Sequence, residues 1–162
     1  SSTKSMTGHT LGAAGAIEKL RLPQQSISAV FISHWHSDHY LDLPHLVNRS
    51  WMVGRNSQLK IFGPTPIDSI LGGMQSFLYQ DQAFREEHHG ASIINSHEGS
   101  SLGYLIDLKS NEAQKVYNND GVAVTAFLVN HDPVTPSLGY KIEFNGRSIV
   151  LSGDTKKSDQ VI

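Results

Sequence analysis

Hydrophobic residues along the chain recur with two periods, one of about two residues and one of three to four. Short runs rich in β-branched and aromatic residues predict strands, because such side chains fit a pleated, half-buried surface. These runs lie at residues 27–32, 59–62, 102–108, 115–117 and 122–129. Two further runs, 138–144 and 147–151, flank Asn145-Gly146, a dipeptide typical of a type I′ turn, and predict a hairpin.

Helical spacing of apolar residues predicts three helices. The first covers residues 10–20 and packs on the sheet through Leu11, Ala14, Ile17 and Leu20. The second covers residues 43–51, with Asp42 as its cap and Gly54 at its end.

The third helix begins at Thr65-Pro66, with Thr65 as the cap and Pro66 at its first position. Its apolar stripe consists of Ile67, Ile70, Leu71, Met74, Phe77 and Leu78. Gly72-Gly73 weakens the middle of this helix and is expected to let it approach the sheet closely. Residues 80–98 are polar and are predicted to be an irregular lid or arm near the site.

Strands interspersed with helices and followed by a hairpin indicate a single domain of mixed α/β (α+β) class. The 162 residues suffice for one domain with a hydrophobic core. A net charge of −2 gives no strong electrostatic attraction to nucleic acid. The absence of Cys excludes disulfides and thiolate metal sites. No apolar run approaches the ~20 residues of a membrane helix, so we expect no membrane partner. The absence of Cys permits a cytosolic or an exported location, and we expect the cytoplasm.

The most informative chemistry is His34-Trp35-His36-Ser37-Asp38-His39, directly after the strand at 27–32. His34 and His36 are two residues apart, so extended backbone places both side chains on one face, where they can hold one ion. Asp38 and His39 follow a turn of the chain and can serve a second ion. Imidazole and carboxylate ligands suit Zn²⁺, and also Fe or Mn²⁺.

Two other predicted strands end in potential ligands. His131 follows the strand at 122–129, and Asp154 follows the second hairpin strand. Strand ends that meet at one edge of a sheet are a favourable place for a metal site, because the scaffold there is rigid.

The H-x-H-x-D-H cluster and the segment NHDPVTPSLGYKIEFNGRSIVLSGDT (residues 130–155) resemble the metallo-β-lactamase superfamily, and within it the ribonuclease Z-like and phosphodiesterase-like branch. The resemblance covers about residues 20–160 and implies an αββα sandwich with a dinuclear metal site at one edge. It implies that His34, His36 and His131 hold the first metal. Asp38, His39 and Asp154 would serve the second, with Asp154 bridging.

A hydrolytic mechanism follows from such a site. Metal-activated water would attack phosphorus or a carbonyl carbon, with Asp38 orienting the water or acting as general base. We expect a phosphodiesterase acting on a small-molecule or nucleotide substrate. Two alternatives stay open: an ester, lactone or β-lactam hydrolase of the same fold, and a non-catalytic metal-binding domain.

The two ends of the chain depart from the family pattern. Residues 1–18 resemble the Lys and His motif of the β-ketoacyl-acyl-carrier-protein synthases, with Lys4 and His9 at the matching positions. Synthase chemistry also needs a Cys, so we interpret residues 1–18 as a grafted segment and residues 19–162 as a partial metallo-β-lactamase-like domain. The family's final His has no counterpart before Ile162, which predicts an incomplete sandwich and a weakened second metal. We expect homo-oligomerisation to cover the exposed sheet surface.

The remaining histidines are weaker predictions. His88-His89 could bind substrate phosphate or a third metal, although a solvated helix end explains the pair equally simply. His45 is expected on the helix after the metal loop, and Trp35 is expected to shield the site or pack the loop.

Overall fold

The computed structural model describes residues 4–7, 12–110 and 112–157. Within these residues the chain forms two four-stranded sheets and five α-helices. Sheet A contains β1 (Lys4–Thr7), β2 (Ile27–Phe31), β3 (Leu59–Gly63) and β4 (Ser101–Leu105). Sheet B contains β5 (Gln114–Asn119), β6 (Val122–Leu128), β7 (Leu138–Phe144) and β8 (Arg147–Leu151). The helices are α1 (Ala13–Lys19), α2 (Ser37–Tyr40), α3 (Leu43–Met52), α4 (Ile67–His89) and α5 (Ser96–Gly99), with a short 3₁₀ turn at Gln24–Ser26.

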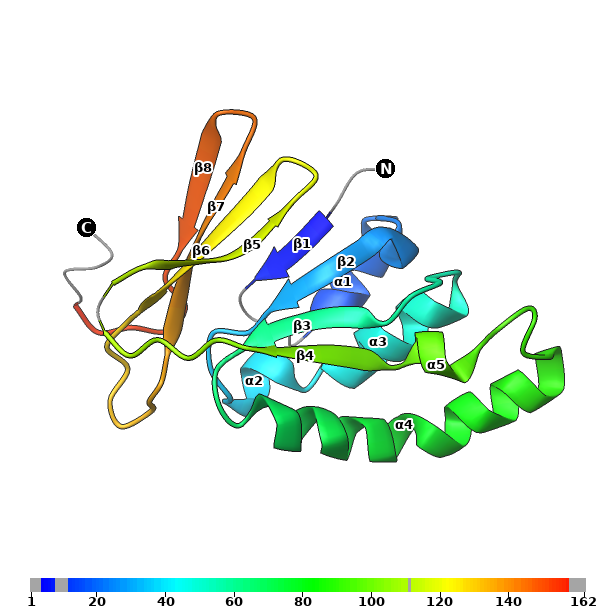
Figure 1. Cartoon of the computed structure of the whole chain (residues 1–162). Helices are drawn as coiled ribbons and strands as arrows, with labels where there is room; N and C mark the ends of the chain where they lie inside the picture. The colour runs from blue at the N-terminus through cyan, green and yellow to red at the C-terminus, as the bar shows by residue number, and fades with distance from the viewer. Residues whose placement is uncertain (1–3, 8–11, 111, 158–162) are drawn as a thin grey trace.

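The described residues form three layers: the helices, then sheet A, then sheet B (Figure 1). Sheet A is parallel and has the order β1-β2-β3-β4, while sheet B is an antiparallel meander in the order β5-β6-β7-β8. The helices cover the face of sheet A that points away from sheet B. In the described residues no helix covers the outer face of sheet B, so this part of the chain contains three layers of the expected αββα sandwich.

Two hydrophobic cores follow from the alternation of side chains along β2. Val30 and Ile32 pack toward the helices, together with Ala14 and Ile17 of α1. Ala29 and Phe31 pack toward sheet B. Because β2 is buried on both faces, its sequence is apolar except at Ser28, as is typical of a central parallel strand.

The hairpin prediction is confirmed. β7 and β8 pair antiparallel, and Asn145 and Gly146 have φ of 48° and 72°. Positive φ at both central residues is the conformation that a type I′ turn requires.

Several helix predictions need correction. Leu20 is 70% exposed and Phe77 is 77% exposed, so neither is part of the core. Leu11 lies outside the described residues. Asp42 makes no capping bond to its own helix, because its Oδ2 accepts a hydrogen bond from the backbone N of Ala14 (2.6 Å) in the first turn of α1. Helix α4 begins at Ile67 after Pro66, so Thr65 is not its cap.

Residues 80–89 are helical, contrary to the predicted irregular lid. Polar contacts explain the difference, because Nε2 of buried Gln82 donates to the carbonyl of Gly99 (2.9 Å). The backbone N of Ser96 donates to the Glu86 carboxylate (2.6 Å). The second half of α4 runs to the end of the molecule opposite α2 and the loop that joins β2 to α2 (Figure 1).

A candidate metal centre at the strand ends

The first three ligands come from the ends of two strands in different sheets. His34 and His36 follow β2 in sheet A, and His131 follows β6 in sheet B. One nitrogen from each lies within 4.8 Å of the others. Nε2 of His34 and Nδ1 of His36 are 3.0 Å apart. The structure therefore brings together the three residues that the resemblance assigned to a first metal.

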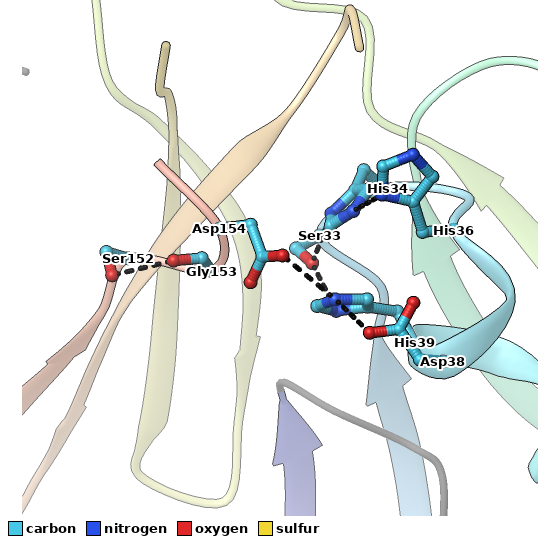
Figure 2. A network of polar contacts seen from close by, with 8 residues as sticks. All are labelled: Ser33, His34, His36, Asp38, His39, Ser152, Gly153 and Asp154. Carbon is cyan, nitrogen blue, oxygen red and sulfur yellow. Dashed lines mark hydrogen bonds and ion pairs between the residues drawn. The ribbon is translucent and has the colours of Figure 1, made fainter. Parts of the chain in front are cut away.

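A second group lies beside the first and contains His34, His39 and Asp154. His39 comes from α2, and Asp154 comes from the loop after β8. Nε2 of His39 lies 3.5 Å from Oδ2 of Asp154 and 3.4 Å from Oδ2 of Asp38 (Figure 2). Asp38 is not a member of either group and its side chain is 57% exposed, so its role as a ligand stays a prediction. The bridging role of Asp154 also stays a prediction.

Burial sets the protonation of the central histidine. His34 is fully buried, and burial, together with neighbouring His39, His131 and His36, lowers its pKa to about 4, although Asp154 acts in the opposite direction. His34 is therefore neutral at pH 7, which is the form that can donate a lone pair to a metal.

The residues fit a divalent ion on two grounds. Nε2 of His131 is buried and has no hydrogen-bond partner among the described residues, and such a nitrogen is costly unless a ligand satisfies it. The donor set is imidazole and carboxylate, which suits Zn²⁺ and similar ions.

Hydrogen bonds between the two sheets, and between two loops of sheet B, hold the strand ends that carry the ligands in place. The hydroxyl of Tyr140 on β7 donates to the carbonyl of Ile32 (2.7 Å), and its burial raises the pKa of the phenol, so the hydroxyl keeps its proton. The backbone N of Leu138 donates to the carbonyl of Ser33 (3.0 Å). The backbone N of Lys156 donates to the carbonyl of Asn130 (2.6 Å), which ties the Asp154 loop to the His131 loop.

The other histidines in the described residues do not join the ligand groups, which include none of His45, His88, His89 and His97. His45 lies on α3 with its Nδ1 3.5 Å from Asp42. Trp35 packs the loop, because its Nε1 donates to the carbonyl of Pro64 (3.0 Å) and its ring stacks edge-on against Tyr40.

Ser33 is a residue of this site that the sequence pattern did not reveal. Its Oγ lies 3.1 Å from Nδ1 of His34 and 3.4 Å from Nδ1 of His39. A serine at the end of a strand is common, and only its burial beneath the two rings marks it as part of the site.

The family model described as the metallo-beta-lactamase superfamily matches residues 7–162. The chain belongs to the metallo-β-lactamase superfamily. The match includes residues 7–18, which are most of the first 18 residues, so it gives no support to a synthase-derived origin of that segment. Lys4 lies in β1, and His9 lies outside the described residues.

Curated relatives within this superfamily include ribonuclease Z proteins. That of Mycobacterium marinum is 30% identical over 132 residues, which are 80% of this chain and 44% of the relative. That of Mycobacterium bovis (strain BCG / Pasteur 1173P2) is 30% identical over 138 residues, which are 83% of this chain and 46% of the relative. The chain thus spans about half the length of the curated relatives it matches. The ribonuclease Z-like resemblance is confirmed.

Solved structures of the superfamily show the same fold. The short form of human tRNase Z superposes with a TM-score of 0.57 at 20% identity, covering 91% of this chain and 56% of that one. The metallo-beta-lactamase fold protein YhfI from Bacillus subtilis gives a TM-score of 0.57 at 17% identity, covering 90% of this chain and 48% of that one. The predicted fold class is confirmed. In the described residues no helix has the length and apolar character needed to cross a bilayer.

Proposed function

We propose that this metallo-β-lactamase-fold chain is a metal-dependent phosphodiesterase and that RNA is its substrate class. The observation that carries the proposal is the pair of ligand groups that meet at His34 on one edge of the sandwich. The ribonuclease Z relatives support phosphodiesters over carbonyl substrates.

In this proposal Nε2 of His34, Nδ1 of His36 and a ring nitrogen of His131 hold the first ion. His39, Asp154 and Asp38 hold the second. Zn²⁺ is the ion that this donor set favours, with Mn²⁺ or Fe as alternatives. When bound, such an ion supplies Lewis acidity and lowers the pKa of a coordinated water to about 7.

Asp38 is the residue that we assign to proton transfer. Its carboxylate is exposed enough to reach an incoming phosphodiester, while Oδ2 stays 3.4 Å from Nε2 of His39. A base must lie within hydrogen-bond reach of the proton that it accepts. Asp38 would orient the water that attacks phosphorus and accept its proton, while neutral His34 and its neighbours hold the site together.

The first test measures the hydrolysis of four substrates by two preparations of the protein. One preparation has been stripped of metal, and the other has been reloaded with zinc. Bis(p-nitrophenyl) phosphate and a single-stranded RNA oligonucleotide should be hydrolysed only by the zinc-loaded protein. p-Nitrophenyl butyrate and nitrocefin should not. His131→Ala and Asp154→Ala should each lower phosphodiester turnover more than about 100-fold, since a metal site supplies several kcal/mol of transition-state stabilisation.

His45→Ala is the matched control, because His45 is an exposed histidine on α3 outside both ligand groups. It should leave turnover unchanged. If the zinc-loaded protein hydrolysed the butyrate ester or nitrocefin but neither phosphodiester, the proposal would be rejected in favour of a carbonyl hydrolase. Zinc binding without turnover of any substrate would leave only the non-catalytic metal-binding domain.

A further inference from the structure

Ser33 lies between one histidine of each proposed metal position. It directly precedes His34 and is 1% exposed. Its Oγ is 3.1 Å from Nδ1 of His34 and 3.4 Å from Nδ1 of His39. Figure 2 shows the hydroxyl between the two rings.

The two rings present the same nitrogen to the ligand groups. Nε2 of His34 faces Nδ1 of His36 at 3.0 Å. Nε2 of His39 faces the carboxylates of Asp38 and Asp154 at 3.4 and 3.5 Å. In each ring, Nδ1 is therefore the nitrogen that can form a hydrogen bond with the Ser33 hydroxyl.

The chemistry of imidazole then fixes where the protons must be. A ring nitrogen that binds a metal donates its lone pair and carries no proton, so a neutral ring keeps its single proton on the other nitrogen. With Nε2 directed to the ligand groups, both His34 and His39 must carry that proton on Nδ1. A serine oxygen has two acceptor lone pairs, enough for both N–H groups.

We propose that Ser33 is a positioning residue that accepts hydrogen bonds from Nδ1–H of His34 and of His39 at once. It thereby holds both rings in the tautomer whose Nε2 can bind a metal. The inference rests on the metal site of the proposed function, and it assigns Ser33 no contact with substrate.

The position of the Ser33 hydroxyl is itself set by both sheets. The Ser33 carbonyl accepts a hydrogen bond from the backbone N of Leu138 on β7 (3.0 Å). A Cβ added at Gly153 would lie 3.0 Å from Cβ of Ser33, so the backbone before Asp154 packs directly on this serine. These two contacts hold the backbone and Cβ of Ser33, from which its oxygen can act as an acceptor of defined position, as a ligand-orienting contact requires.

The test measures zinc affinity by competition with a chromogenic chelator, together with ¹⁵N-imidazole NMR of the zinc-loaded protein. Ser33→Ala should lower zinc affinity by roughly 10- to 100-fold, the usual effect of losing a residue that orients a metal ligand. Ser33→Thr retains the hydroxyl and should restore most of the affinity. In the zinc-loaded wild-type protein, the NMR spectrum should place the protons of His34 and His39 on Nδ1.

Ser37→Ala is the matched control, because Ser37 is an exposed serine at the start of α2, four residues after Ser33. It should leave zinc affinity unchanged. Wild-type affinity in Ser33→Ala, an equal loss in Ser37→Ala, or a proton on Nε2 of either zinc-loaded histidine would overturn the inference. The NMR result in the wild-type protein can overturn the inference even if Ser33→Ala does not fold, because a proton on Nε2 would leave no Nδ1–H for Ser33 to accept. None of these readouts needs turnover. An inactive protein that shows the expected tautomers and the expected loss of zinc affinity in Ser33→Ala would reject the proposed function and leave the role of Ser33 intact.

Discussion

At the scale of single residues, the protein buries a histidine that it keeps uncharged. His34 has no exposed surface and lies next to three other imidazoles, with ring centroids 4.7, 4.1 and 4.8 Å from those of His36, His39 and His131. Bringing a proton to this cluster is unfavourable, because the charge would be desolvated and would face other groups that can become cationic. Without metal, the site therefore makes the fold sensitive to acid.

The sign of that sensitivity follows from the pKa of His34, which falls from 6.5 to about 4 on folding. Below pH 6.5 the unfolded chain takes up a proton that the folded chain refuses until about pH 4, so the free energy of unfolding falls across this window. Below about pH 4 both states are protonated and His34 contributes no further loss. Urea unfolding in the presence of chelator, measured from pH 7.5 downward, should show this decline.

His34→Asn should flatten the decline, because asparagine does not titrate. His45→Asn changes an exposed histidine on α3 and should keep the wild-type slope. Equal slopes in wild type and His34→Asn would contradict the assignment of this titration to His34.

At the scale of elements, two glycines differ in the space around them, and therefore in what an added side chain would do to stability. Gly139 on β7 lies opposite Phe127 on β6, and a Cβ at this position would collide with the Phe127 ring. Gly73 lies in the middle of α4, where an added Cβ would meet nothing within 4 Å.

Gly72 and Gly73 are both exposed, so they do not mediate the predicted close approach of α4 to the sheet. That approach occurs at Gly103 of β4, where a Cβ would lie 3.0 Å from Leu71.

The same substitution should therefore have opposite signs at the two sites. Gly139→Ala should lower the free energy of unfolding by about 1–3 kcal/mol, because it overpacks a buried cross-strand contact. Gly73→Ala should raise it by up to about 1 kcal/mol, since alanine favours the helix. Denaturant midpoints of the two variants provide the measurement, and stabilisation by Gly139→Ala would show that Phe127 can move aside.

At the scale of the whole molecule, the two sheets present apolar side chains on edge strands. Leu105 on β4 and Ile149 on β8 are 53% and 55% exposed. Both strands have an unpaired edge among the described residues. An edge strand with exposed apolar residues is a site at which another chain can pair or pack.

We expect the chain to self-associate through these strands at micromolar concentration. Light scattering should give a mass above that of a monomer, and Leu105→Lys together with Ile149→Lys should return it to the monomer mass, because charges at sheet edges oppose pairing. Phe77→Lys alters an apolar side chain on α4 that is even more exposed (77%) and should not change the association. A monomeric wild-type chain would refute this expectation.

The sequence alone determined the features that depend on local spacing. Alternation over short runs placed the strands, Asn145-Gly146 placed the hairpin turn, and the interval between His34 and His36 placed two nitrogens 3.0 Å apart. His131 and Asp154 were predictable because each follows a strand, and strand ends meet at one edge of a sandwich.

Only the tertiary structure decided which polar groups would be buried together. The Asp42 carboxylate binds the first turn of α1, and Gln82 holds the second half of α4 against Gly99, and both partners come from distant segments. The contact of Ser33 with His39 spans only six residues, yet it depends on the turn of the chain at α2, which the spacing of the ligands does not specify. Hydrophobic periodicity specifies which face of an element is buried, but the partner of a buried polar atom is set by packing, because a hydrogen bond requires a definite distance and direction between chain segments that sequence spacing does not relate.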